Sequence, residues 1–117
     1  MEEKITIGDK EIMMRANANT PRRYREAFGR DLLVDLTVLL KHIDRASGQL
    51  VGDFDFSTVE NLAFTMAKQY DPSLGNIDDW LEQFEGIDDV YIAMPQIFGL
   101  WEKSKKTTSE PKKNIDK

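Results

Sequence analysis

The sequence predicts an α+β domain that is mainly α-helical, with an N-terminal β-hairpin packed on about five helices and a disordered C-terminal tail. Near the N-terminus, apolar residues alternate with polar ones, which is the period of a half-buried strand. From residue 20 onward they recur every three or four positions, the period of an amphipathic helix. A chain of 117 residues, 40% of them hydrophobic, can form one domain with a modest core.

The hairpin is predicted from the segment between residues 5 and 14. Gly8-Asp9 suits a two-residue turn, because glycine accepts the positive φ that such turns require. The turn pairs Ile7 with Lys10 and sets the register of the two strands. The apolar face of the hairpin then consists of Ile5, Ile7, Ile12 and Met14. A lone hairpin is marginal in water, so we expect this face to pack on the helices.

Two helices are predicted next. Thr20 is expected to cap the first helix, with Pro21 at the first helical position, where a missing N–H has no consequence. Gly29 is expected to end this helix, and Asp31 to cap the second one. The second helix has a predicted buried stripe of Leu32, Leu36, Leu39, Leu40 and Ile43. The segment 46–56, with two glycines, is predicted to be a loop.

Three more helices follow in the prediction. Ser57 and Glu60 match a capping box at the start of the third helix, and Pro72 disfavours helix at the residue before it. A short amphipathic helix is expected over 77–84. Asp88 is predicted to cap the last helix, which extends to about residue 101, and Pro95 predicts a kink near Tyr91.

Charge divides the chain into an acidic body and a basic tail. Residues 1–102, the predicted domain, carry a net charge of −9, and residues 103–117, the predicted disordered tail, carry +4. An acidic body repels a phosphate backbone, so nucleic acid is not an expected partner. No apolar stretch is long enough for a membrane helix, and the N-terminal residues do not resemble a signal peptide; we therefore expect an intracellular protein with no membrane partner.

The composition argues against catalysis. The chain has no cysteine and a single histidine, His42, so the usual nucleophile and zinc arrangements lack their residues. Asp53 and Asp55 do not fit the order of a calcium loop, and the aspartate pairs at 78–79 and 88–89 are better interpreted as favourable charges at helix starts. We expect no enzyme activity, no metal site and no cofactor.

Two sets of residues are candidates for binding a partner. The first is an arginine cluster around Tyr24 and Phe28, made of Arg22, Arg23, Arg25 and Arg30. These arginines could bind a partner, or they could pair with Asp78, Asp79, Asp88 or Asp89 of the acidic body. The second set is aromatic: Trp80, Phe84, Phe98 and Trp101. Aromatic residues at helical spacing belong either to the core or to a partner-binding face, and internal packing is the commoner case.

Five segments together resemble the tail assembly chaperones of siphophages and related prophages of Gram-positive hosts. They are the hairpin ITIGDKE from Ile5, TPRRYREAFGRD from Thr20, AFTMAKQYDP from Ala63, DDWLEQFE from Asp78 and MPQIFGLW from Met94. The resemblance covers about residues 5–102, and its motifs are structural. None of them is a catalytic signature.

The resemblance implies a protein that binds the tape measure protein, keeps this long helical polypeptide soluble and promotes assembly of tail-tube subunits around it. The tail tube protein is then a second partner, and self-association is a third that the resemblance leaves open. It also implies a location in the cytoplasm of the bacterial host and absence from the mature virion. Lys112-Lys113-Asn114 is compatible with a slippery codon run, which predicts a longer product made by programmed frameshifting.

A different class of function remains as the alternative. In it, the chain is a small regulatory adaptor that binds an acidic partner or nucleic acid through Arg22, Arg23, Arg25 and Arg30. Binding through arginines should weaken steeply with salt, whereas capture of an apolar helix should not. Salt dependence therefore separates the two hypotheses.

Overall fold

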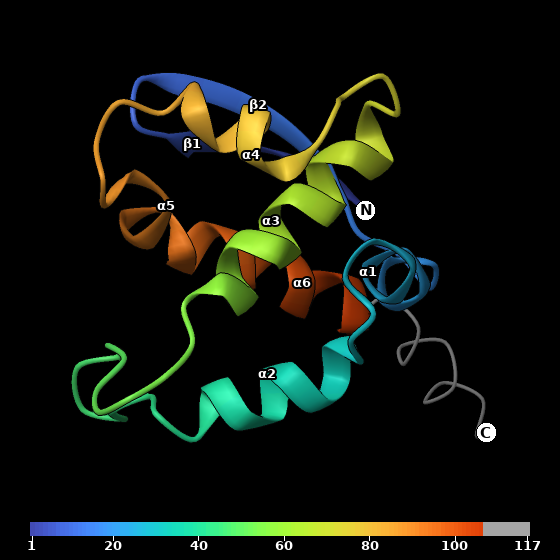
Figure 1. Ribbon diagram of the computed structural model, residues 1–117. Coiled ribbons are helices and arrows are strands. Elements are labelled where there is room, and N and C mark those ends of the chain that lie inside the picture. Colours follow the sequence, from blue (N-terminus) through green and yellow to red (C-terminus); the bar gives the residue numbers. More distant parts are fainter. Residues whose placement is uncertain (107–117) are drawn as a thin grey trace, which may run out of the picture.

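The computed structural model describes residues 1–106, in which an N-terminal antiparallel hairpin is followed by six helices (Figure 1). This confirms the predicted mainly helical α+β fold. The part of the predicted tail at 107–117, including the frameshift segment, lies outside the described residues. The elements are β1 (Glu2–Ile7), β2 (Lys10–Arg15), α1 (Thr20–Phe28), α2 (Leu32–Leu40), α3 (Ser57–Tyr70), α4 (Ile77–Glu82), α5 (Asp89–Ile92) and α6 (Met94–Lys106).

The hairpin has the predicted register. Ile7 pairs with Lys10 and Ile5 with Ile12, across a turn in which Gly8 has φ of 64°. The apolar face is turned inward: Ile5, Ile7 and Met14 are buried. A side chain is hydrogen-bonded to the outer edge of β1. The side-chain amide of Gln96 accepts from the Thr6 N–H at 2.9 Å and donates to the Thr6 carbonyl at 3.2 Å.

Helix α3 lies at the centre of the molecule, with the hairpin and α4 on one side and α2 on the other (Figure 1). It contacts β2, α1, α2, α4, α5 and α6. Its buried residues are Thr58, Val59, Leu62, Ala63, Phe64, Thr65, Met66 and Ala67. Helix α3 is therefore the element around which the core is packed.

The ends of α1 and α2 are mostly as predicted. Gly29 ends α1 in the left-handed region, with φ of 69°, and Asp31 caps α2 by accepting from the Val34 N–H at 3.1 Å. The predicted cap at Thr20 is wrong, since α1 begins at that residue and Asn19 precedes it as the cap. Thr20 is fully buried, and its hydroxyl donates to the Gln69 side chain of α3 at 2.5 Å. Its hydroxyl therefore connects two helices.

The start of α3 differs from the predicted capping box. Ser57 is the first helical residue, so its hydroxyl is not at the cap position. Asp55 Oδ1 accepts instead from the Ser57 N–H at 3.0 Å and from the Ser57 hydroxyl at 2.5 Å. The Asp55 carboxylate thus accepts the Ser57 N–H that the sequence assigned to Glu60, and the Glu60 N–H donates to the Phe56 carbonyl instead of to the Ser57 hydroxyl.

The predicted last helix is two helices. The chain leaves α5 at Ile92 and enters α6 at Met94, so the proline at position 95 lies in the first turn of a new helix, where its missing N–H is tolerated. The expected kink near Tyr91 is therefore a complete break at Ala93. Asp88 precedes α5, but its side chain makes no capping bond. The helix also continues to Lys106, so the predicted tail boundary at 103 is too early.

Candidate interaction surface on helix α2

The inner side of α2 is anchored in the core. Leu32, Leu36 and Leu39 are buried, as the predicted stripe requires. Asp35 lies on the same side and is also buried, with 6% of its surface exposed. A buried carboxylate requires partners that offset the loss of its hydration.

Two side chains supply those partners. The Tyr24 hydroxyl donates to Asp35 Oδ2 at 2.9 Å, and the Arg30 guanidinium donates to both carboxylate oxygens at 2.8 and 2.7 Å. The bonds from Arg30 hold the pKa of Asp35 below its usual value. Burial, followed by the bond to Asp35, raises the pKa of Tyr24 to about 12. This network fixes α2 against α1 and sets which side of α2 faces outward.

The outer side of α2 is apolar and uncovered. Leu33, Val34, Val38 and Leu40 are 55%, 58%, 53% and 45% exposed. The prediction that Leu40 belongs to the buried stripe is wrong. Leu40 lies two turns after Leu33, and therefore on the exposed side of α2 rather than on the side that packs on α3. Exposed large hydrophobic side chains on four positions of a nine-residue helix form a continuous surface.

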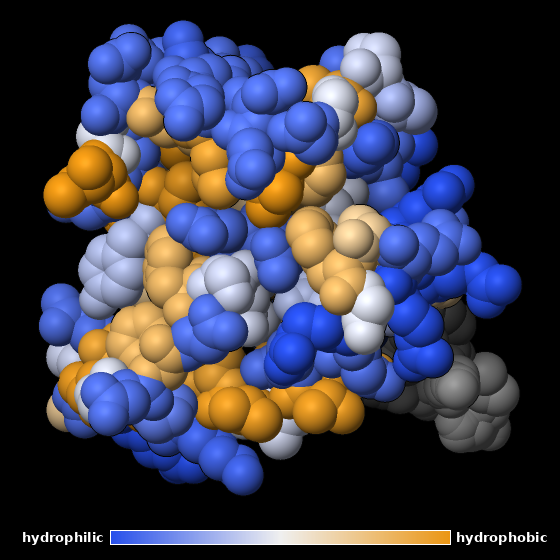
Figure 2. All heavy atoms as spheres, viewed as in Figure 1, coloured by the Kyte–Doolittle hydropathy of each residue, from blue (hydrophilic) through white to orange (hydrophobic). Residues whose placement is uncertain are grey.

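One polar residue, Thr37, lies among the apolar residues on this outer side of α2. The Thr37 hydroxyl donates to the Leu33 carbonyl at 2.8 Å, so it is satisfied by its own helix. Lys41 follows the last turn and is exposed. We call the group Leu33, Val34, Thr37, Val38 and Leu40 the α2 surface. In Figure 2 apolar side chains gather along the lower edge of the molecule, where α2 runs in Figure 1.

The loop after α2 is closed by backbone contacts between its two ends. The backbone N–H of Val51 donates to the His42 carbonyl at 2.7 Å, and Ile43 forms an isolated bridge with Leu50. His42 Nδ1 also lies 3.1 Å from the Val51 carbonyl, which gives this histidine a structural role. The loop is therefore folded back on itself at the end of α2, and Val51 is 52% exposed.

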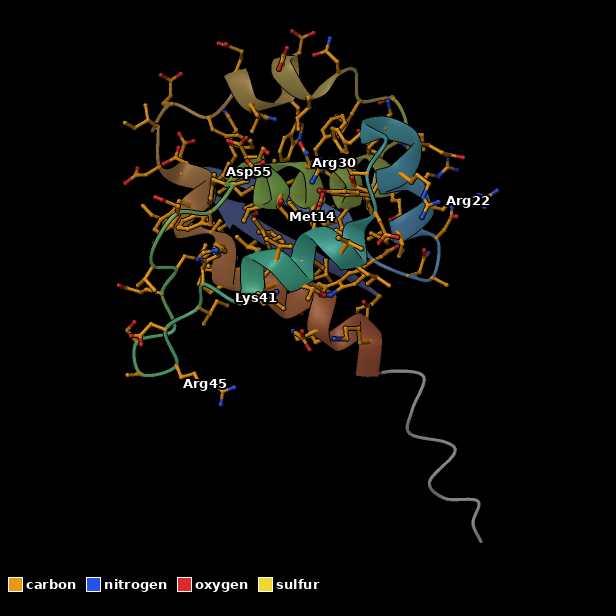
Figure 3. All side chains as sticks on the ribbon, turned by 60° about the horizontal axis from the view of Figure 1, so that its bottom comes forward. Met14, Arg22, Arg30, Lys41, Arg45 and Asp55 are labelled. Atoms are coloured by element: carbon orange, nitrogen blue, oxygen red, sulfur yellow. The ribbon has the colours of Figure 1, made fainter. Side chains whose placement is uncertain are left out.

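A charged hollow borders one edge of the α2 surface. It has a volume of about 110 Å³, and it is lined by Arg30, Val34, Asp35, Val38, Leu39, Asp55 and Thr58. Figure 3 shows Arg30 and Asp55 near each other beside α3, whereas Arg22 and Arg45 point away from the body. The apolar edge formed by Val34 and Val38 thus lies directly beside charged groups.

No family model, curated protein or solved structure matches this chain.

Two further chemical features bear on function in residues 1–106. In that part of the chain, no three side chains of the metal-binding types come together as a metal site. No helix there is both long enough and apolar enough to cross a membrane.

The arginines of the cluster are paired with carboxylates close to them in sequence. Arg22 and Arg23 both lie next to Glu26, at 3.9 and 3.5 Å, and Arg25 lies 3.1 Å from Asp31. The acidic partners predicted at 78–79 and 88–89 are wrong, because each arginine pairs with a carboxylate close to it in sequence. Since Arg30 is bound to Asp35, it serves mainly to fix α2.

Arg23 also lines a groove with a volume of about 420 Å³ between α1, α3 and the end of β2. Arg15 and Lys68 line it as well, together with Glu26. Arg15 is held in place by Glu2 at 2.7 Å and by the Gln69 carbonyl at 3.3 Å. The groove has an excess of positive charge, so its chemistry suits a small anion or a carboxylate.

The aromatic candidates lie in or against the core. Trp80 and Trp101 are 5% and 8% exposed, and Phe84 and Phe98 are partly buried against the same cluster. The Trp80 ring contacts Phe64 and Phe84 edge-on, with centroids 5.6 and 5.1 Å apart. Their placement agrees with internal packing, and it offers a partner little of either tryptophan.

Sequence reasoning missed the α2 surface. The segment LLVDLTVLL contains seven large apolar residues in nine positions, so it has apolar side chains on every side of the helix. A helix of that kind is normally buried all round. Only the structure shows that neighbouring elements cover one side of this helix. The apolar composition could still have indicated that the other side binds a partner.

Proposed function

We propose that this protein is a phage tail assembly chaperone that binds apolar helical segments of the tape measure protein through the α2 surface. The observation that carries the proposal is the set of exposed apolar side chains on α2. The resemblance of residues 5–102 to tail assembly chaperones supports the same reading, since it implies a long helical client. The tail tube protein is a further partner in this proposal, and the site of action is the host cytoplasm before the virion matures.

The size of the α2 surface fits a helical client. The exposed fractions of its four apolar residues correspond to an area on the order of 400 Å², whereas each partner in a standard stable interface buries about 800 Å². The surface is thus small for a stable dimer of this chain. A single amphipathic helix that lays one apolar stripe on it needs only i, i+3, i+4 and i+7 anchors.

Weak individual contacts suit the proposed role. A tape measure protein presents many apolar helical segments in one polypeptide, so several copies of a weak binder can cover it and later leave it. The acidic body, with a charge of −9, also disfavours contact between copies at low salt. The proposed chaperone therefore coats its client without forming a stable oligomer of its own.

The test is co-expression of this chain with the tape measure protein of the same genome. We expect the tape measure protein to remain soluble and to co-purify at both low and high salt, because apolar burial is not screened by ions. The double variant Val34→Gln/Val38→Gln should lose this rescue, while Ile92→Gln should retain it. Ile92 is a matched control, since it is 66% exposed on α5, away from the α2 surface.

Two results would contradict the proposal. One is an insoluble tape measure protein with the wild-type chain present. The other is equal rescue by wild type and by Val34→Gln/Val38→Gln, which would place the binding site elsewhere. Circular dichroism and urea unfolding of each variant exclude a loss of fold as the cause.

The adaptor hypothesis has one observation in its favour, the cationic groove lined by Arg15, Arg23 and Lys68. Under that hypothesis, Arg23→Gln should weaken binding of an acidic partner, and raised salt should weaken it further. The same salt series therefore separates the adaptor from the chaperone. Salt-resistant binding that survives Arg23→Gln favours the chaperone.

A further inference from the structure

The hollow beside the α2 surface contains a carboxylate with an open position. Both hydrogen bonds of Asp55 go to Oδ1, from the Ser57 N–H and hydroxyl. Within residues 1–106, Asp55 has no salt bridge, and Oδ2 has no hydrogen bond. Bonds from Ser57 hold the pKa of Asp55 below its usual value, so the side chain is charged at neutral pH.

The charges around Asp55 leave a local excess of negative charge. Arg30 is the nearest cation in the hollow, but it is engaged with both oxygens of Asp35. Glu60 lies one turn into α3, and burial together with the charge of Asp55 raises its pKa. Across the part of the chain that the structure describes, neither Asp55 nor Glu60 has a basic partner closer than 4 Å. The charge of Arg30 helps to lower the pKa of Asp55, but Arg30 is shared between two carboxylates, Asp35 and Asp55, so the hollow keeps a net negative charge.

This charge lies at a defined place relative to the apolar side chains. The hollow is lined by Val34 and Val38, so a helix resting on the α2 surface would pass its flank over Asp55. The residues of the bound helix that face Asp55 would be those that border its apolar stripe. A lysine or arginine there could reach a carboxylate, because both have long flexible stems that pack on apolar surface.

We propose that the α2 surface selects amphipathic helices with a lysine or arginine beside their apolar stripe, and that Asp55 binds this cation. The proposal rests on the proposed function, since it specifies the chemistry of the client at the same site. The apolar residues supply contact area, and Asp55 supplies the preference for charge. Electrostatic complementarity at a rim acts in this way, because it penalises like charges and favours one orientation.

The probes for the test are three synthetic helical peptides of one length and one apolar stripe, with lysine, glutamine or glutamate at the positions that flank the stripe. Their dissociation constants for the full chain are measured by fluorescence anisotropy. We expect the lysine peptide to bind tightest and the glutamate peptide weakest, with a total difference of about five- to tenfold at low salt, as partly exposed ion pairs produce. High salt should reduce the difference.

Asp55→Asn is the central variant. Asparagine keeps an oxygen for the two bonds from Ser57 but removes the charge, so the peptide preference should largely disappear while binding of the glutamine peptide stays unchanged. Asp78→Asn is the matched control, because Asp78 is exposed on α4, on the other side of α3 from α2 (Figure 1). If Asp55→Asn fails to fold, Glu60→Gln should reduce the preference in part.

Three outcomes overturn the inference. Equal binding of all three peptides, or an unchanged preference in Asp55→Asn, removes the role of Asp55 but leaves the proposed function intact if Val34→Gln/Val38→Gln abolishes binding. Binding that ignores both Asp55→Asn and Val34→Gln/Val38→Gln places the contact away from α2, which contradicts the proposed function as well. Absence of binding by any peptide removes the inference, and the rescue of the tape measure protein then decides the proposed function separately.

Discussion

The hydroxyl of Tyr24 donates a 2.9 Å hydrogen bond to the buried carboxylate of Asp35, and this bond joins α1 to α2. Because hydrogen bonds to charged groups contribute about 1.5–3 kcal/mol, Tyr24→Phe should lower the free energy of unfolding by roughly that amount. Urea unfolding measures it. Tyr70→Phe is the control, since the Tyr70 ring contacts Arg15 and its hydroxyl makes no hydrogen bond within residues 1–106. Equal stability of Tyr24→Phe and wild type would contradict the structural role of the bond.

The same tyrosine predicts behaviour in alkali. The pKa of Tyr24 is raised from 10.0 to about 12, so the folded state favours the neutral phenol. Its contribution to stability is complete below pH 10 and is lost as the pH rises toward 12. Ultraviolet titration should show a late phenolate step near pH 12 that Tyr24→Phe removes. A step completed by pH 10.5 would show that Tyr24 is not buried against Asp35.

Asp35 predicts behaviour in acid. Its pKa is lowered below 3.8, chiefly by the bonds from Arg30, so its contribution to stability is present above pH 3.8 and is lost as the pH falls through the folded value. Asp35→Asn should therefore be less stable than wild type at pH 7, and the difference should shrink below pH 3.8. Urea midpoints between pH 2.5 and 7 measure it. A constant difference across this range would exclude a charged Asp35 in the folded state.

A fourth prediction concerns the contact between the hairpin turn and the start of α5. A Cβ added to Gly8, which has φ of 64°, would lie 2.5 Å from Asp89 Oδ2, and this oxygen already accepts the Gly86 N–H at 2.9 Å. Gly8→Ala should destabilise the protein by about 1–3 kcal/mol through backbone strain, with a further loss from displacing Asp89. In an Asp89→Ala background, Gly8→Ala should carry the strain alone. Thermal or urea unfolding of the four chains measures the coupling.

Gly48→Ala is the control for this cycle. Gly48 has φ of 73°, but a Cβ there would meet nothing within 4 Å. It should therefore match Gly8→Ala in the Asp89→Ala background. A Gly8→Ala penalty that does not depend on Asp89 would exclude the steric part of the argument.

The two sides of α2 should respond differently to substitution. Leu36→Ala removes a side chain that is 4% exposed and should destabilise the protein by about 2–4 kcal/mol, because it leaves a cavity. Val38→Gln should change stability by less than about 0.5 kcal/mol, since Val38 is 53% exposed. Urea unfolding compares them. A large loss in Val38→Gln would mean that the outer side of α2 is covered.

Much of this fold could be predicted because turns and helix ends depend mainly on residues that are close together in the sequence. The Gly8-Asp9 turn fixes the hairpin register through geometry that involves only a few residues. Gly29 and Asp31 likewise mark helix ends through backbone groups that lie next to them. The capping box at Ser57 failed because Asp55, within the same few residues, accepts the Ser57 N–H that the box assigns to Glu60. The spacing of residues in the sequence does not show which of two nearby carboxylates accepts a given N–H.

The interaction surface was beyond local signals for a different reason. Leu33 and Leu36 have the same side chain, and only the presence of α3 on one side makes one exposed and the other buried. Asp35 was missed in the same way, since a carboxylate inside an apolar helix gains its partners from outside that helix: Tyr24 from α1 and Arg30 from the turn between α1 and α2. Exposure and pairing depend on neighbours that spacing along one helix does not specify.

Gln96 has a consequence for how the hairpin is kept in place. A strand that slips by one residue reverses which side chains face inward, and for β1 this would move Ile5 and Ile7 into water. The two bonds between Gln96 and the Thr6 backbone occupy the position where a third strand would pair, so slippage must break both. They also take up the free edge at Thr6, where an extended segment of another chain would otherwise add. The Gln96 side chain thus stabilises the register of the two strands and blocks the addition of a strand from another molecule at the edge of the sheet.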